Sequence, residues 1–352
     1  MKKYLSTYFL RGGFLVLLIA GSFSARAQDF HLSQYDAAPL NLNPSMTGLF
    51  EGYYRIHAHY RTQWSAIATN PFQTFAVSFD MPVEKWAFGG QLMDYRAGAG
   101  NYNVFSFLGS VGYDYALDKE NEYHHISGGV QLGIMQQSIN FGKLTWDAQY
   151  TNANGGSFNT SLPSQETFAN DGMFMPDLNA GFIYYYGKEK SRLNPFIGFA
   201  ANHLTRPKET FYASDNRLPI RYTIHGGTRV NVNEKLQLLP KFLILRQTNA
   251  RELTASLVAQ YYLAQSDVFL FAGPTFRLSG PLGNKANYYG AENDAAVIDM
   301  GMKMGSFIYR LSYDINTSSL QPYTNSRGGL EISVTYTGRR SQPDRIPNCP
   351  RL

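Results

Sequence analysis

The sequence predicts an all-β fold, a transmembrane antiparallel β-barrel of the outer-membrane type with about 14 strands. Three observations lead to this prediction. Segments of about ten residues alternate apolar and polar side chains, as strands do when one face meets lipid and the other lines a wet interior. Aromatic residues make up 15% of the chain, and mean hydropathy is modest at -0.29. Short and long connections between the alternating segments follow one another along the chain, as in outer-membrane barrels.

Residues 1–27 have the features of a secretory signal peptide. The first eleven residues carry positive charge, and an apolar run of about ten residues follows at 14–23. This run is too short to span a bilayer. Small residues, Ala25 and Ala27, stand at the positions that signal peptidase reads, so cleavage is expected before Gln28.

Removal of the signal peptide changes the net charge. The full chain has 31 basic and 26 acidic residues. Four basic residues and no acidic residue lie in the first 27 positions, which leaves 27 minus 26, or about +1. No basic stripe indicates a nucleic-acid partner. The only cysteine, Cys349, cannot form an internal disulfide, so a free thiol, an intermolecular pairing and an inert tail residue all stay open.

Residues 53–337 are expected to form the barrel. In the segment 307–315, for example, odd positions carry Phe, Tyr, Leu, Tyr and Ile, and even positions carry Ile, Arg, Ser and Asp. No helical periodicity extends over a useful length. The predicted strands lie near 53–64, 72–81, 86–95, 102–117, 124–140, 177–186, 194–203, 219–230, 235–246, 251–263, 267–277, 294–303, 306–315 and 327–337.

The connections fall into two sets. Those after the even-numbered strands are short, whereas those after the odd-numbered strands are often long, the longest being 141–176. Outer-membrane barrels have short periplasmic turns and longer extracellular loops. This pattern predicts that both termini lie in the periplasm. The long loop is either a solvated lid or a binding site, because loops of this length are commonly functional or disordered.

Two segments flank the predicted barrel. Residues 28–52 carry Pro39, Pro44 and Gly48 at turn-forming spacing. They are expected to form a periplasmic N-terminal segment that either caps the barrel or enters its lumen as a plug, since a barrel of this size has interior space that side chains alone do not fill. Residues 338–352 are expected to form a periplasmic C-terminal tail.

Histidines offer the only candidates for a metal site. His57 and His59 are two apart, so they share one face of a strand with Arg55 and Arg61, and by alternation that face is the lumen. The two arginines oppose a cation, which favours polar lumen residues over metal ligands. No metal and no cofactor are therefore expected.

Nothing in the chain carries an enzymatic signature. No G-x-S-x-G sequence is present for a nucleophilic serine. Gly98-Ala99-Gly100 follows a strand, but no helix follows it to complete a phosphate-binding loop. Separate strands could still assemble a triad, so the prediction of no catalytic residues and no enzyme rests on the lack of any local motif.

Short motifs stand toward the two ends of the chain, namely Ser33-Gln34-Tyr35, Asn43-Pro44-Ser45-Met46-Thr47-Gly48, Tyr60-Arg61-Thr62-Gln63-Trp64 and Cys349-Pro350-Arg351. They resemble those of the PorP/SprF family of outer-membrane proteins. The family pattern runs S-Q-Y, then N-P-A-x-x-G, then Y-R-x-Q-W, and it ends in C-P-R-F. Ser45 and Leu352 stand where the family usually has Ala and Phe. The residues that match, and that become candidates for structural or partner contacts, are Ser33, Gln34, Tyr35, Asn43, Pro44, Gly48, Tyr60, Arg61, Trp64, Cys349, Pro350 and Arg351.

The resemblance implies a component of the type IX secretion and gliding apparatus. Such barrels work with periplasmic and peptidoglycan-linked partners, and some assist secretion or surface anchoring of an exported adhesin. Trp64 is then either a residue of the interfacial aromatic girdle or a partner contact. The alternative prediction is an outer-membrane channel or small-solute transporter, which requires an open polar lumen.

Overall fold

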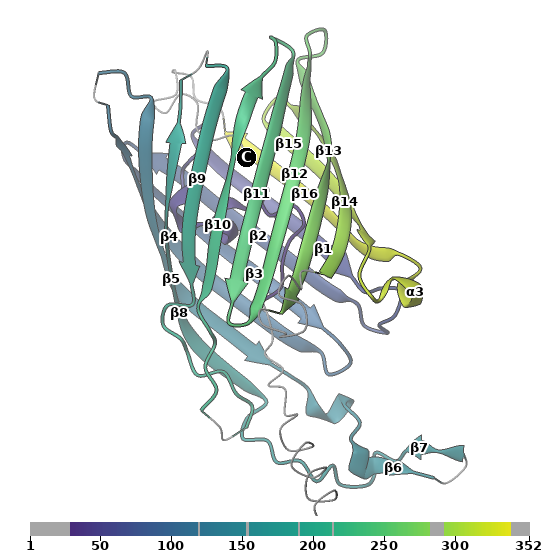
Figure 1. Ribbon diagram of the computed structural model, residues 1–352. Coiled ribbons are helices and arrows are strands. Elements are labelled where there is room, and N and C mark those ends of the chain that lie inside the picture. Colours follow the sequence, from purple (N-terminus) through teal and green to yellow (C-terminus); the bar gives the residue numbers. More distant parts are fainter. Residues whose placement is uncertain are drawn as a thin grey trace, which may run out of the picture.

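The computed structural model describes residues 29–118, 120–152, 155–188, 191–212, 215–281 and 292–338. These residues form a closed antiparallel barrel of 14 strands (Figure 1), which confirms the predicted fold class. The predicted signal peptide and the tail motif of Cys349, Pro350 and Arg351 lie outside the described residues.

Each barrel strand pairs with its neighbour in the chain, and the first strand pairs with the last to close the sheet. The strands are β1 (Tyr54–Gln63), β2 (Phe72–Val83), β3 (Trp86–Ala97), β4 (Tyr102–Ala116), β5 (His124–Ser138), β8 (Gly172–Tyr186), β9 (Leu193–Asn202), β10 (Arg221–Asn231), β11 (Leu236–Gln247), β12 (Ala250–Leu263), β13 (Val268–Pro281), β14 (Glu292–Met304), β15 (Phe307–Asn316) and β16 (Arg327–Gly338).

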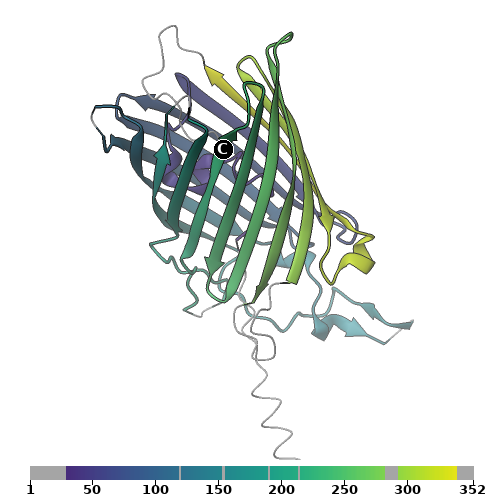
Figure 2. The ribbon, with the colours of Figure 1, turned by 45° about the horizontal axis from the view of Figure 1, so that its top comes forward.

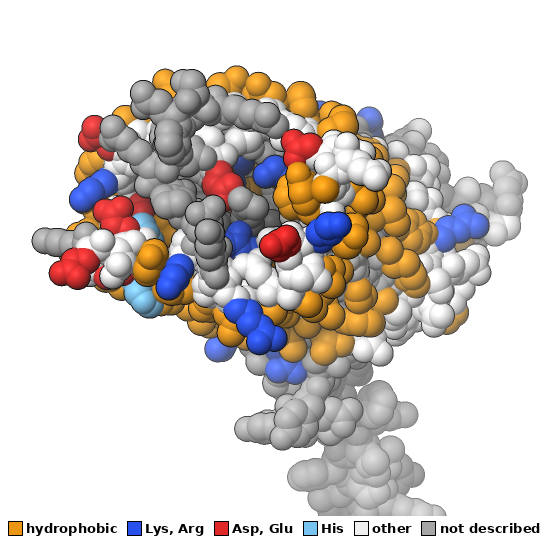
Figure 3. Space-filling view, turned by 90° about the horizontal axis from the view of Figure 1, so that it is seen from above, with side chains coloured by type: hydrophobic (Ala, Val, Ile, Leu, Met, Phe, Trp, Pro, Cys, Tyr) orange, Lys and Arg blue, Asp and Glu red, His pale blue; other side chains and the backbone are white. Residues whose placement is uncertain are grey.

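The barrel is apolar outside and polar within. On β15, Leu311 and Tyr313 are each 42% exposed, whereas Ser312 and Asp314 are each 1% exposed. Hydrophobic side chains cover the outer wall, and charged side chains gather around the opening (Figure 3). This inversion of a soluble core is the arrangement that lipid requires, because the closed sheet satisfies every strand's backbone groups internally.

The two ends of the barrel differ. The turn side holds the start of β1, the end of β16 and short connections such as 84–85 and 305–306. The loop side holds the long connections 139–171 and 203–220, together with 317–326. The first of these carries η2 (Phe141–Lys143), η3 (Asp147–Gln149) and the two-stranded sheet of β6 (Tyr150–Thr151) and β7 (Ser157–Phe158), and the last carries α3 (Gln321–Thr324).

Strand β8 departs most from the prediction. It begins at Gly172, five residues before the predicted start at 177, and it contains Pro176, which lies opposite Ile134 of β5. Proline lacks the N–H that a ladder needs, so it is unusual in the interior of a sheet. Here the strand continues through it. Among the described residues, no helix is long and apolar enough to cross a membrane.

Candidate functional site

Residues 29–52, named here the lumenal segment, run through the interior of the barrel (Figure 2). Asp29 lies at the loop side, where its carboxylate binds groups at the ends of β9, β10 and β11. From there the chain runs through α2 (Pro39–Leu42) and η1 (Pro44–Met46) to the turn side, where β1 begins. Each short helix begins with a proline, whose fixed φ suits the first helical position.

The Ser33-Gln34 pair binds the last strand of the barrel. The backbone N–H of Gln34 donates to the Glu331 carboxylate at 2.9 Å, and its side-chain amide donates to the Ser312 hydroxyl at 3.1 Å. The Ser333 hydroxyl in turn donates to the Gln34 amide oxygen at 2.7 Å. Gln34 and Glu331 are each almost fully buried, so these hydrogen bonds satisfy groups that water does not reach.

Arg61 connects this pair to the barrel wall. Its guanidinium donates to the Ser33 hydroxyl at 2.8 Å, to Asp314 at 3.0 Å and to Glu331. Arg277 of β13 donates to the same Ser33 hydroxyl at 2.6 Å and to Asp314 at 3.0 Å. One serine hydroxyl thus bridges two buried arginines, and the carboxylates offset the cost of burying their charges.

Asp36 ties the segment to two further side chains of the barrel wall. Its carboxylate pairs with Lys241 of β11 and, at 3.0 Å, with Arg310 of β15. Arg310 also pairs with Asp299 of β14. All four side chains are largely buried. The adjacent Tyr35 turns its ring into an apolar cluster, while its hydroxyl lies 3.4 Å from that of Ser256.

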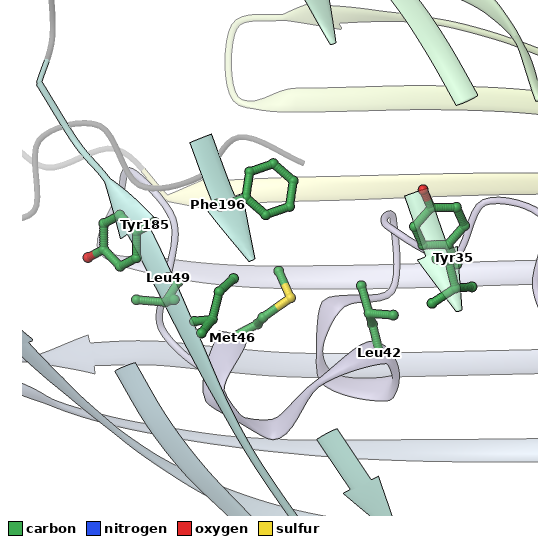
Figure 4. Close-up of a cluster of buried hydrophobic side chains, with 8 residues drawn as sticks. Tyr35, Leu42, Met46, Leu49, Tyr185 and Phe196 are labelled. Atoms are coloured by element: carbon green, nitrogen blue, oxygen red, sulfur yellow. The ribbon is translucent and has the colours of Figure 1, made fainter. Parts of the chain in front are cut away.

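Apolar side chains of the segment pack against the wall between these polar ties (Figure 4). Met46 extends toward Phe196 of β9 in that view. The buried cluster comprises Tyr35, Leu42, Met46, Leu49, Ile183, Tyr185, Phe196 and Leu243. The lumen therefore has its own small hydrophobic core, which a water-filled pore would lack.

Asn43 organises the turn around Pro44. Its side-chain nitrogen lies 3.0 Å from the His225 ring and donates to the carbonyls of Phe182 and Phe199. Its side-chain oxygen accepts hydrogen bonds from the N–H and hydroxyl of Ser45. Asn43 is fully buried, and it links the segment to three strands at once.

Glycines of the wall make room for this turn. Gly112, Gly129 and Gly181 face one another on adjacent strands β4, β5 and β8. A Cβ at Gly129 would overlap with the Pro44 carbonyl, and one at Gly181 would overlap with the Asn43 side chain. The segment can approach the sheet this closely only because these positions lack side chains.

Gly48 closes the turn-side end of the segment. It has a φ of 74°, which favours glycine, and a Cβ there would overlap with Ala87. Its N–H donates to Asp80 at 2.7 Å, and Arg55 pairs with the same carboxylate at 2.7 Å. This glycine therefore meets both a conformational and a packing requirement.

Asp29, His203 and Arg221 form a charged cluster at the loop side. The Asp29 carboxylate lies 2.8 Å from the His203 ring and 3.0 Å from the Arg221 guanidinium. The other ring nitrogen of His203 lies 3.0 Å from Asp177. Burial lowers the pKa of His203, but the Asp29 carboxylate and the bond to Asp177 outweigh it and raise the pKa to about 9. Burial raises the pKa of Asp29, but His203 and Arg221 outweigh it and hold that pKa well below its ordinary value.

Two cavities flank the lumenal segment. The turn-side cavity has a volume of about 170 Å³ and is lined by residues that include Asp36, Lys241 and Thr337. The loop-side cavity has a volume of about 390 Å³ and lies between the charged cluster and the ends of β3 to β5. The segment lies between the two, so neither cavity is a continuous path through the barrel.

The sequence matches a known family model. The model for the PorP/SprF family, described as type IX secretion system membrane proteins, matches residues 24–336. The chain belongs to the PorP/SprF family. The resemblance predicted from the terminal motifs is thereby confirmed.

The comparison with solved structures shows the fold of the PorP/SprF chain. The CymD monoaromatic hydrocarbon channel matches with a TM-score of 0.51 at 10% identity, over 87% of this chain and 94% of that one. A TodX deltaS2S3 mutant, also a monoaromatic hydrocarbon channel, matches with a TM-score of 0.50 at 10% identity, over 86% and 94%. No curated protein sequence matches the chain. Barrel fold and family together locate it in the outer membrane.

The PorP/SprF motif residues do not all meet. Ser33, Gln34 and Arg61 come together at Glu331. Asn43, Pro44 and Gly48 lie farther along the segment, toward the turn side. Tyr60 faces outward and is 39% exposed, as a lipid-facing strand residue is. Trp64 follows β1 with a φ of 66° at the loop side. Ser45, where the family usually has Ala, adds a hydroxyl bond of 2.7 Å to Asn43.

The histidines of β1 serve as hydrogen-bonding groups in this PorP/SprF lumen. His57 lies 2.9 Å from the Thr335 hydroxyl, and His59 lies 3.1 Å from the Glu331 carboxylate. Both are 1% exposed, as expected for lumen residues. Within the described part of the chain, no group of three or more His, Cys, Asp or Glu residues could hold a metal ion.

The motifs of the PorP/SprF family contain some of the residues that hold the lumenal segment, but they do not contain most of the partners of these residues. The residues that hold the segment but were not singled out in the sequence are Asp29, Asp36, His203, Arg221, Lys241, Arg277, Arg310, Asp314 and Glu331. The strand residues among them share a signal: each is a charged residue at an inward position of a predicted strand. Charge at such positions is costly unless paired, so a search for inward charges would have found them.

Proposed function

We propose that this chain serves the type IX apparatus as a plugged outer-membrane barrel that assists secretion or surface anchoring of an exported protein, such as an adhesin. The single observation that carries the proposal is the filled lumen. Ion pairs and hydrogen bonds tie the lumenal segment to strands around the barrel, and a small apolar core packs between them. A barrel that fills its own interior in this way suits a docking or anchoring role in the membrane.

The proposed orientation follows from the two kinds of connection. Outer-membrane barrels have short turns in the periplasm and long loops outside. We therefore expect the turn side, with the tail 338–352, to meet periplasmic and peptidoglycan-linked components of the apparatus. The loop side, with connections 139–171 and 203–220, would then meet the exported protein at the cell surface.

The filled lumen argues against the alternative of a channel or small-solute transporter. A solute that crosses the barrel would have to displace residues 29–52. Displacement would break buried ion pairs such as those of Asp36 with Lys241 and Arg310, whose side chains are 3%, 5% and 9% exposed. Breaking a buried ion pair by removing one partner costs about 3–5 kcal/mol, and several such pairs would have to break together.

Gene deletion tests the proposed function. Surface proteins of intact cells are labelled with a membrane-impermeant biotin reagent, and the labelled set and the culture medium are compared between wild-type, deletion and complemented cells. The expected result is that one or a few exported proteins disappear from the surface in the deletion strain and return on complementation. An unchanged set of surface and secreted proteins would refute the proposal.

The single cysteine allows a direct test of orientation. The chain contains no cysteine besides Cys349, so a membrane-impermeant maleimide reports on the C-terminal tail alone. We expect labelling only after the outer membrane is permeabilised. A Ser161→Cys variant in the connection 139–171, made with Cys349→Ser, serves as the matched control and should be labelled in intact cells. Labelling of Cys349 in intact cells would contradict the proposed orientation.

A further inference from the structure

The loop-side cavity has two chemically different walls. One wall is formed by β2, β3 and β4 and is aromatic and apolar, with residues such as Tyr95, Met93 and Leu108. The other is formed by β5, β8, β9 and β10 and is polar, with Gln137, Asn202 and others. The two walls enclose about 390 Å³, within the range of specific small-molecule sites.

The apolar wall consists of rings that hold each other in place. Tyr95 stacks on Phe30 of the lumenal segment with ring centroids 5.1 Å apart. Phe72 and Tyr102 meet Tyr95 edge-on, at 6.1 and 6.4 Å. All four residues line the cavity. Such interlocked rings give a rigid apolar surface at little entropic cost on binding.

The polar wall contains side-chain atoms without hydrogen-bond partners among the described residues. They are the side-chain oxygens of Gln137 and Asn202, one carboxylate oxygen of Asp177 and the Nε of Arg221. All four residues line this cavity, and none is more than 7% exposed. Buried polar atoms normally have partners, so four such atoms around one cavity point to a ligand or ordered water.

We infer that the loop-side cavity binds a saccharide unit. A sugar ring presents an apolar C–H face, which fits the aromatic wall, and hydroxyl groups that both donate and accept hydrogen bonds. Hydroxyls can satisfy the Asp177 carboxylate as donors and the Arg221 Nε as acceptors. The carboxamide oxygens of Gln137 and Asn202 can each accept a hydrogen bond from a hydroxyl. The ligand is thus a mono- or disaccharide unit, free or at the end of a longer glycan.

Other ligand classes fit this cavity less well. A hydrocarbon would leave the buried polar atoms of Gln137, Asp177 and Arg221 without partners, which is unfavourable. A strongly cationic or anionic group would meet a mixed lining, because Asp29, Asp177 and Arg221 lie close together. The inference does not depend on the proposed role in secretion, since sugar binding and surface delivery are measured separately.

Direct binding tests the inference. The full mature barrel is purified in an amine-oxide detergent, which has no sugar headgroup. Saturation-transfer NMR and titration calorimetry are run with glucose, galactose, mannose, N-acetylglucosamine, maltose and lactose, and with toluene as an apolar probe. The expected result is binding of at least one sugar, with the strongest transfer to its C–H protons.

Two cavity variants and a matched control make the test specific. Ser106→Trp places an indole in the loop-side cavity, and Asn202→Leu keeps the shape but removes the carboxamide. Each is expected to weaken sugar binding at least tenfold. Thr337→Trp places the same indole in the turn-side cavity and should leave binding unchanged. Folding of every variant is checked by its heat-dependent mobility in gel electrophoresis.

The outcomes separate the possibilities. Failure of all six sugars to bind the wild-type barrel would overturn the inference and leave ordered water as the occupant. Binding of toluene but of no sugar would overturn it too, as would equal sugar affinity in wild type and Ser106→Trp. Where a sugar binds, outer-membrane polysaccharide and glycopeptides released from exported proteins are titrated in parallel, and the tighter ligand identifies the source of the saccharide.

Discussion

Gln34 and Glu331 are joined by a hydrogen bond of 2.9 Å from the backbone N–H of one to the carboxylate of the other, although 297 residues separate them. Glu331 lies on β16, opposite Arg61 of β1 in the register that closes the barrel. The lumenal segment therefore binds where the first and last strands meet. This position couples the filling of the lumen to the closure of the sheet.

Loss of the Glu331 charge should destabilise the barrel. Glu331→Gln keeps the shape of the side chain but leaves the buried Arg61 and the two N–H groups of Ser33 and Gln34 with a weaker acceptor. We expect the free energy of unfolding to fall by about 3–5 kcal/mol, as measured by urea titration in detergent. Arg96→Gln, which removes an ion pair whose arginine side chain is 68% exposed, should cost less than about 1 kcal/mol. Equal effects of the two variants would contradict the role assigned to Glu331.

Two adjacent glycines of β5 provide a matched pair. A Cβ at Gly129 would overlap with the Pro44 carbonyl, whereas a Cβ at Gly128 would meet nothing within 4 Å. Gly129→Ala should therefore destabilise the protein by about 1–3 kcal/mol through overpacking, and Gly128→Ala should be nearly neutral. Proteolysis of the lumenal segment, followed by mass spectrometry, should be faster in Gly129→Ala alone. An unchanged rate would show that the segment does not rest on this part of the wall.

The loop-side attachment should weaken at high pH. The pKa of His203 is raised to about 9, so its contribution to stability is complete below its ordinary pKa of 6.5 and is lost as pH rises through about 9. Asp29 and Asp177 face the two nitrogens of the ring, and Arg221 pairs with the same Asp29 carboxylate. His203→Gln should thus destabilise the barrel by about 1–3 kcal/mol near pH 6 and progressively less above pH 9.

The contribution of Asp29 to stability depends on pH in the opposite direction. The pKa of Asp29 is lowered, so its contribution is present above its ordinary pKa of 3.8 and is lost as pH falls below that value. Unfolding midpoints of wild type and His203→Gln, measured from pH 2 to 10, test both limbs. A constant difference between the two proteins across that range would show that the Asp29–His203 pair does not hold the segment.

Strand-level features of the barrel could be read directly from the sequence. Alternation alone located all 14 strands, because one face meets lipid and the other does not, as at Leu311 and Ser312 of β15. The largest boundary error lies at the start of β8, where the strand extends through Pro176, a residue type that is unusual inside a sheet. Local sequence patterns determine where the strands lie, and closure of the sheet adds only the register between neighbouring strands.

The contacts of the lumenal segment could not be read in the same way. Ser33 and Arg277 are 244 residues apart, and no local sequence pattern around either residue predicts their contact. The Asn43 contact with His225 spans 182 residues. Long-range pairs of this kind depend on which strands face each other across the lumen, and alternation does not determine that. The motif residues were visible in sequence, but their partners were not.

Conductance in planar bilayers tests the central claim most directly, because the account holds that residues 29–52 fill the lumen. The full mature barrel is compared with a variant that lacks residues 29–48, after both are shown to be folded by their heat-dependent gel mobility. We predict no stable conductance for the full barrel and open, ohmic steps for the shortened one. Steady conductance of equal size from both proteins would contradict the account.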